Sequence, residues 1–129
     1  MDKTMLVQFA SEARKMARVP NSGFRVGAAL EVEDGTVITG CNVELANTLS
    51  SICAERTAIV KAVSMGYQTF TALAVVSDAK EPISPCGFCR QYLVDFALDM
   101  PVYMANDDLS IIKSTTTGEL MPMPFLGKD

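Results

Sequence analysis

Residues 24–43 have the sequence FRVGAALEVEDGTVITGCNV. The segments 24–32 and 36–43 are apolar and rich in β-branched side chains, and Asp34 and Gly35 stand between them. An Asp-Gly pair between two such segments is a strong signal for a β-hairpin turn. The stretch therefore predicts two antiparallel strands, around which the other elements of the fold can be placed.

Helical and strand patterns alternate along the rest of the chain. Before the hairpin, Thr4 is expected to cap a helix that runs to about Arg18, with Phe9 and Met16 among the apolar residues along one side. The polar residues 44–51 indicate a loop. After this loop we expect a helix, a strand, a helix and two strands, at 52–65, 70–77, 86–98, 102–105 and 109–115.

This order of elements predicts the α/β fold class. The five strands would form a mixed sheet, and helices on both faces would complete a three-layer α/β/α sandwich. A chain of 129 residues suits one domain over residues 1–129. In the helix at 52–65, alanines recur at every fourth position, at Ala54, Ala58 and Ala62. Side chains four apart share a helix face, so this small face predicts close packing against the sheet.

The composition restricts the class of partner. The formal net charge is −4, and an acidic chain repels phosphate backbones unless it carries a local basic stripe, which the sequence lacks. The N-terminus has no signal-peptide pattern, and no apolar stretch is long enough to span a bilayer. These features predict a cytoplasmic protein that acts on an uncharged small molecule, without a membrane or nucleic-acid polymer as partner.

The chain has four cysteines and no histidine. Without a secretory signal, the cysteines are expected to be reduced and to serve as metal ligands or catalytic groups. The lack of histidine excludes Ser-His-Asp and Cys-His catalysis, and it excludes metal sites that use imidazole.

The chemistry is expected at Cys53, Glu55, Cys86 and Cys89. Cys53 and Cys86 both fall at predicted helix N-termini, where free backbone N–H groups and the helix dipole favour a thiolate. Cys86 and Cys89 are three residues apart, so they share a helix face and can bind one ion together with Cys53. Three protein ligands leave a fourth zinc position for water, which is typical of a catalytic site. The pattern therefore predicts Zn²⁺ as the cofactor.

Glu55 follows the first cysteine by two residues and is the expected acid–base group. In the first helical turn, its carboxylate can reach a water beyond the helix end without binding the metal. Such a carboxylate can accept a proton from the water and return one to the leaving group. The next residue, Arg56, is expected to draw charge from the thiolates, because three of them on one Zn²⁺ leave a net negative charge.

Four motifs resemble those of the small, homotetrameric, zinc-dependent cytidine deaminases. They are FRVGAA at 24–29, GCNVE at 40–44, CAERTAI at 53–59 and SPCGFCRQ at 84–91, in the order of the family. The resemblance implies a cytidine deaminase-like fold and hydrolysis of free cytidine or deoxycytidine to the uridine nucleoside and ammonia, in pyrimidine salvage. It also implies that Cys53, Cys86 and Cys89 bind the zinc and that Glu55 passes the proton of water to ring N3.

The resemblance further implies four substrate contacts. Asn42 and Glu44 would hold the ribose hydroxyl, and Phe24 would lie against the pyrimidine ring. Near the C-terminus, Phe125 would reach the site of a neighbouring subunit. A homotetramer with shared active sites is thus an implication of the resemblance.

Three positions depart from the family pattern. Asn21 and Thr48 stand where many relatives have Tyr, and Leu49 stands where Gly or Pro is usual. In family members the loop around 48–49 approaches the 5′ side of the sugar from an adjacent subunit. These departures leave the zinc chemistry intact but affect which nucleoside is preferred. An alternative hypothesis is therefore that the substrate is a modified cytidine or a cytosine-nucleoside antibiotic.

Other interpretations of the same residues remain open. Cys41 could complete a closed structural zinc site, and Cys86 with Cys89 could instead form a thioredoxin-like dithiol that binds no metal. Asn42 and Glu44 could simply satisfy backbone groups at the end of a strand. Arg56 could equally form a surface ion pair.

Overall fold

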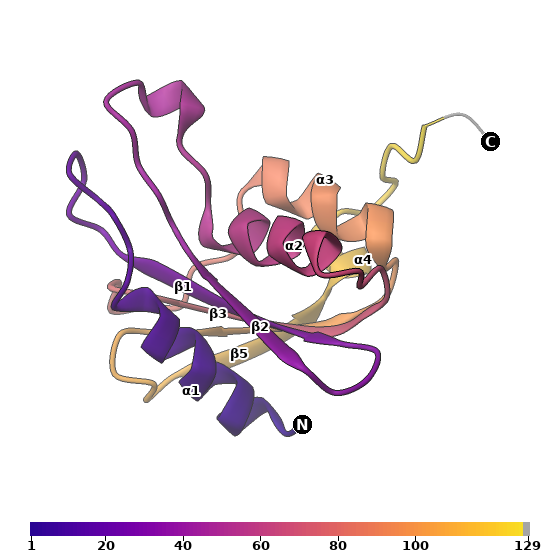
Figure 1. The fold of residues 1–129 in the computed structure, drawn as a ribbon. Helices are drawn as coiled ribbons and strands as arrows, with labels where there is room; N and C mark the ends of the chain where they lie inside the picture. The colour runs from indigo at the N-terminus through magenta and orange to yellow at the C-terminus, as the bar shows by residue number, and fades with distance from the viewer. Residues whose placement is uncertain (128–129) are drawn as a thin grey trace.

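The computed structural model describes residues 1–127, and its five strands form one mixed sheet in the order β2-β1-β3-β4-β5 (Figure 1). The pair β3–β4 is parallel, whereas the other neighbours are antiparallel. None of the described helices is long and apolar enough to cross a membrane. The elements are α1 (Lys3–Arg14), β1 (Val26–Val32), β2 (Val37–Cys41), η1 (Thr48–Ser50), α2 (Ala54–Ser64), β3 (Phe70–Ser77), α3 (Gly87–Phe96), β4 (Pro101–Ala105), β5 (Ile112–Thr116) and α4 (Thr117–Leu120).

Helices cover both faces of the sheet, with α1 on one face and α2 and α3 on the other (Figure 1). Successive side chains of a strand point to opposite faces. Accordingly, Leu30 of β1 packs into the core beneath α2 and α3, whereas its neighbour Ala29 packs into the core beneath α1. Both faces of the central strands are therefore buried. The α/β class, the mixed five-stranded sheet and the three-layer arrangement are confirmed.

The predicted hairpin is confirmed as β1 and β2. Val32 and Thr36 close the turn through a bond from the Val32 N–H to the Thr36 carbonyl (3.0 Å). Gly35 has φ of +86°, a left-handed conformation that glycine adopts without steric cost. Three-residue hairpin loops often end in such a residue. The strands are shorter than expected, since β1 begins at Val26 and β2 ends at Cys41.

The small face of α2 lies directly against β2. Ala54, Ala58 and Ala62 are fully buried, as the four-residue spacing predicted. Opposite them, a Cβ at Gly40 would lie 2.6 Å from both the Ala54 carbonyl oxygen and the Ala58 nitrogen. Strand and helix thus meet backbone to backbone, and this contact fixes where the N-terminus of α2 lies over the sheet.

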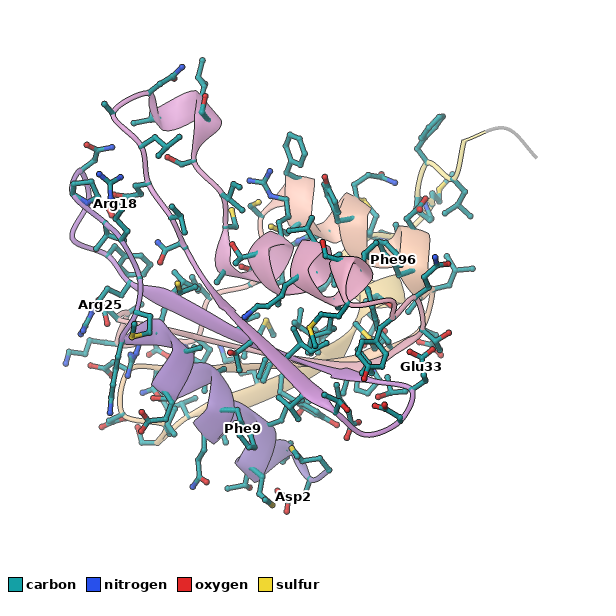
Figure 2. All side chains as sticks on the ribbon, viewed as in Figure 1. Asp2, Phe9, Arg18, Arg25, Glu33 and Phe96 are labelled. Atoms are coloured by element: carbon teal, nitrogen blue, oxygen red, sulfur yellow. The ribbon has the colours of Figure 1, made fainter. Side chains whose placement is uncertain are left out.

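The first helix differs from its prediction. Asp2, rather than Thr4, is the N-cap, and its Oδ1 accepts a hydrogen bond from the Met5 N–H (3.0 Å). The helix ends at Arg14, and Met16 beyond it is 78 % exposed. Phe9, labelled on α1 in Figure 2, is 42 % exposed, so the apolar stripe predicted on this helix is only partly buried.

The C-terminal region also differs from its prediction. Leu109, expected at the start of the last strand, has φ of +64° and lies in the turn before β5. The Asn106 side chain stabilises this turn, because its Oδ1 accepts from the Ile111 N–H and its Nδ2 donates to Ser110 Oγ (both 3.0 Å). The short helix α4 was not predicted. Thr116 caps it by accepting a bond from the Glu119 N–H.

The contact between α2 and β2 predicts that Gly40→Ala lowers the free energy of unfolding by about 1–3 kcal/mol, the usual cost of an overpacked core. The added methyl group would meet backbone atoms that have no rotamer with which to move aside. Denaturant unfolding of the variant measures this loss. Gly87→Ala is the control, because a Cβ at Gly87 has no neighbour within 4 Å. Equal stability of the two variants would contradict the role given to the contact.

Candidate functional site

Three cysteines meet where α2 and α3 begin, and Figure 2 shows sulfur atoms grouped at this point. Cys53 is the N-cap of α2, Cys86 is the N-cap of α3, and Cys89 lies in the first turn of α3. The Sγ atom of Cys86 lies 3.7 Å from that of Cys53 and 3.5 Å from that of Cys89. All three sulfur atoms lie within 4.8 Å of one another. The sequence spacing thus becomes a single cluster of three thiols.

This cluster fits a zinc ion. Zinc binds cysteine sulfur at about 2.3 Å in tetrahedral geometry, which places ligand sulfurs about 3.8 Å apart. The measured separations of 3.7 and 3.5 Å lie close to that value. Among residues 1–127, Cys41 is not part of the group, so the structure does not support the four-cysteine alternative. Three thiols leave one zinc position open, which is the donor set of a catalytic site.

The pKa values of the Cys53 and Cys89 thiols are shifted in opposite directions. The neighbouring Cys89 thiol is the largest cause that lowers the pKa of the Cys53 thiol, to about 5. Arg56 lowers this pKa further, whereas burial opposes both effects. The same contact with Cys53 raises the pKa of the Cys89 thiol, and burial raises it further. Cys53 is therefore the first of the pair to become a thiolate, the form that binds metals.

Glu55 lies in a small cavity beside the cluster. Its side chain is almost fully buried, and burial, the largest cause, raises the pKa of its carboxyl to about 7. The cavity has a volume of about 150 Å³. A carboxyl that titrates near neutral pH is suited to accept and then donate a proton. The residues that line the cavity are Val26, Asn42, Cys53, Ala54, Glu55, Ile83, Ser84 and Cys86.

A wider, more polar cavity of about 490 Å³ adjoins the small one, and the two share Asn42 and Cys53 in their walls. Polar side chains on its wall include Glu44 and Ser51. Thr48 and Leu49, two of the departures noted in the sequence, also line it. The inner cavity is therefore sized for a small ring beside the thiols, and the outer one offers hydroxyl-binding groups.

Asn42 and Glu44 both support the backbone around the site. The Oδ1 of Asn42 accepts a bond from the Val26 N–H, and its Nδ2 donates to the Phe24 carbonyl (both 2.9 Å). Glu44 accepts bonds from two backbone N–H groups and from the Ser22 hydroxyl, at 3.1, 3.1 and 2.6 Å. These bonds, the Ser22 side chain first, lower the pKa of the Glu44 carboxyl. The backbone role considered for these residues is therefore present, while both side chains still border the outer cavity.

Phe24 and Phe125 occupy different surroundings. Phe24 is partly buried and packs against the core beneath α2 and α3. Phe125 is 74 % exposed and lines a separate cavity of about 430 Å³ along α3. Neither of the two cavities beside the cysteines includes Phe125 in its wall. Within one chain, the structure thus keeps Phe125 apart from the thiol cluster.

Arg56 points at the cluster rather than forming a surface ion pair. Its Nη2 donates to the Cys53 Sγ at 3.6 Å, and its Cζ lies 4.5 Å from the centroid of the Phe88 ring. Its Nε is buried and has no hydrogen-bond partner among residues 1–127. The sequence indicated Arg56 but gave Phe88 no role. Phe88 lies between Cys86 and Cys89, and its contact with Arg56 joins two helices, so no periodic pattern in the sequence indicates it.

Arg90 is a second residue that sequence reasoning missed. Its guanidinium donates to the Pro85 carbonyl (2.7 Å), to the Ser84 hydroxyl (2.7 Å) and to the Leu120 carbonyl (2.9 Å). These bonds hold the loop that leads into Cys86 against the end of α4. The position of Arg90 directly after Cys89 was visible in the sequence, but its partners lie in separate parts of the chain.

Comparison with known proteins places these features in context. Residues 1–105 match the family described as the cytidine and deoxycytidylate deaminase zinc-binding region. The chain is 48 % identical over 130 residues to the cytidine deaminase of Sporosarcina psychrophila. This match covers 100 % of this chain and 95 % of that protein. The chain is 45 % identical over 130 residues to the cytidine deaminase of Halalkalibacterium halodurans, with coverages of 100 % and 98 %.

A solved structure agrees with these relatives. The crystal structure of cytidine deaminase from Burkholderia pseudomallei superposes with a TM-score of 0.93 at 41 % sequence identity. The match covers 97 % of this chain and 100 % of the other. Fold and sequence therefore point to the same group of proteins.

The cluster predicts that the purified protein retains one zinc ion per chain, and that Cys53→Ser, Cys86→Ser and Cys89→Ser each lose it. Elemental analysis after dialysis against a chelator measures the metal content. Cys41→Ser is the matched control and should keep its zinc. Loss of zinc from that control would support a closed four-cysteine site, whereas a metal-free protein with a reversible Cys86–Cys89 disulfide would support the dithiol alternative.

Proposed function

The chain belongs to the zinc-binding cytidine and deoxycytidylate deaminase family, and on this premise we propose that it hydrolyses free cytidine and deoxycytidine to the uridine nucleoside and ammonia. One observation carries this conclusion: Cys53 and Cys86 border the same small cavity as the buried Glu55 carboxyl, and Cys89 completes their zinc-like cluster of three thiols. That arrangement is typical of zinc-dependent nucleobase deaminases.

The three clustered cysteines and Glu55 each have a chemical role in this reaction. Cys53, Cys86 and Cys89 hold the zinc, which when bound makes water a stronger acid and so supplies the nucleophile. Glu55 accepts the proton of the attacking water and delivers it to ring N3, which makes C4 more electrophilic. Glu55 then transfers the second proton to the exocyclic amine, which leaves as ammonia. Water and cytidine are consumed, and uridine and ammonia are formed.

The substrate is placed by the two adjoining cavities. The pyrimidine lies in the inner cavity, and the sugar extends into the outer cavity. By the family resemblance Phe24 lies against the ring, although in the free chain it packs on the core and lines neither cavity. Glu44 accepts a hydrogen bond from a ribose hydroxyl, and Asn42, which lines both cavities, adds a second polar contact. Because the Glu44 carboxylate repels phosphate, an uncharged nucleoside is preferred to a nucleotide or a polymer.

The outer cavity also supports a second substrate class. Thr48 and Leu49 line it, and Leu49 is 94 % exposed. These residues contribute no Tyr ring, so the wall near the sugar has room for a substituted nucleoside. A modified cytidine or a cytosine-nucleoside antibiotic is the alternative substrate, and its turnover relative to cytidine decides between the two.

Arg56 adjusts the charge of the zinc ligands in this proposal. A guanidinium that donates to the Cys53 sulfur withdraws electron density from it. Three thiolates would otherwise leave the metal a weak Lewis acid. Arg56 therefore contributes to turnover through the sulfur of Cys53.

The proposed assembly is a homotetramer of single-domain chains, in which Phe125 completes the site of a neighbouring subunit. The placement of Phe125 on a separate cavity along α3, away from the thiols of its own chain, supports this assignment. We place the enzyme in the cytoplasm and in pyrimidine salvage, because the site needs reduced thiols and a free nucleoside.

Glu55→Gln should keep its zinc and lower kcat by about 10²–10⁴-fold, since general acid–base catalysis contributes that much. The fall in ultraviolet absorbance of cytidine and the release of ammonia measure turnover, and elemental analysis measures zinc. Glu33→Gln, in the exposed hairpin turn, is the matched control and should behave as wild type. Wild-type turnover by Glu55→Gln would overturn the proposed mechanism.

Phe125→Ala should raise KM by about 2–10-fold at unchanged zinc content, the range expected for loss of one aromatic stacking contact. Mixing this variant with inactive Glu55→Gln, followed by subunit exchange, should restore a portion of activity with the wild-type KM. That portion comes from sites that combine an intact Glu55 with the intact Phe125 of a neighbour. Monomers in sedimentation analysis, or no recovery after exchange, would refute the shared site.

A further inference from the structure

Phe88 is an aromatic residue with no assigned role that lies between two proposed zinc ligands. Its ring is 65 % exposed, although it borders both the outer cavity and the cavity along α3. On one side it lies 4.5 Å from the Arg56 guanidinium carbon, and on the other it stacks near Tyr92, with ring centroids 6.2 Å apart at 26°. Tyr92, Phe88 and Arg56 thus form a stacked column that joins α3 to α2.

This column ends at a sulfur atom. The Nη2 of Arg56 donates to Cys53 Sγ at 3.6 Å, while its Nε is buried without a hydrogen-bond partner in the described chain. A guanidinium that gives up hydration at Nε must be stabilised by something else. The Phe88 ring supplies that stabilisation, because a cation is attracted to the face of an aromatic ring.

We propose that Phe88 is a positioning residue that holds the Arg56 guanidinium against the Cys53 sulfur. The inference rests on the proposed function and extends it to a residue that does not touch the reacting atoms. With the ring in place, Arg56 keeps one orientation and directs its N–H at the sulfur. Without the ring, water reaches the guanidinium, its side chain gains rotamers, and the hydrogen bond to the thiolate weakens.

Loss of the hydrogen bond from Arg56 would increase the electron donation of the Cys53 sulfur. A sulfur that loses a hydrogen bond holds its electrons at higher energy. It then donates more charge to a bound metal, which becomes a weaker Lewis acid. Phe88→Leu should therefore lower kcat by about two- to fivefold, the factor expected for one exposed cation–π contact, with the metal still bound.

The decisive experiment is a double-mutant cycle on cobalt-substituted protein. In the wild-type background, Phe88→Leu should move the thiolate-to-Co²⁺ charge-transfer band to longer wavelength, because the sulfur becomes easier to oxidise. In an Arg56→Gln background the same change should leave the band and kcat unaltered, since no guanidinium remains to be positioned. Arg56→Gln alone should produce the larger shift. The band reports on the sulfur without any substrate.

Two further variants serve as controls. Phe88→Tyr keeps an aromatic face and should retain the wild-type band and kcat. Phe9→Leu removes a similarly exposed ring from α1, on the other face of the sheet, and should change neither.

The outcomes separate this inference from the proposed function. Equal effects of Phe88→Leu in both backgrounds would show that Phe88 acts without Arg56 and would overturn the inference, as would an unshifted band. Either result leaves deamination by zinc and Glu55 standing. A wild-type protein that gives no thiolate band with Co²⁺ would overturn the proposed function itself, and the inference with it.

Discussion

The backbone contact between α2 and β2 is the constraint on which the site depends. Gly40 brings the strand so close to the helix that only alanines fit on the facing side. This proximity places the first turn of α2, with Cys53 and Glu55, directly over the sheet and buries the Glu55 carboxyl. Because α3 packs on the same face, its N-terminus meets that of α2, and the three thiols come together. A larger residue at Gly40 would move Cys53 and Glu55 together.

The two helix N-termini bring three thiols together, and ionised thiols at this distance would repel one another. The free N–H groups of the same helix ends partly compensate that negative charge. Three sulfur atoms within 4.8 Å of one another cannot all be ionised without compensation. Backbone N–H groups at the two helix starts, the Arg56 guanidinium and a bound cation all favour the thiolate form. Glu55, two residues away, experiences the opposite environment, because burial favours its neutral form. On one helical turn the pKa of the Cys53 thiol is thus lowered while that of the Glu55 carboxyl is raised.

Side chains in the loops around the cavities both line the cavities and bond to the backbone. Asn42 fixes the start of β1 through both ends of its amide, and Glu44 holds the turn at Ser22. Rigid side chains of this kind lose little entropy when a ligand binds. Arg90 similarly holds the loop before Cys86 to the end of α4. The walls of the two cavities are therefore fixed in part by hydrogen bonds that already exist in the free chain.

Local sequence by itself determined the hairpin at Asp34-Gly35, the alanine face of α2 and the position of Cys53 and Cys86 at helix starts. Each of these depends on backbone preferences or on side-chain periodicity within a few residues. It did not determine where α1 ends, the turn at Leu109 or α4, because these features depend on contacts with residues in other parts of the chain. Only the tertiary structure decided that Cys41 stays outside the cluster, that Arg56 points at Cys53 and that Phe88 stacks on Arg56. Such contacts join separate elements of the fold, so no spacing within a single element encodes them.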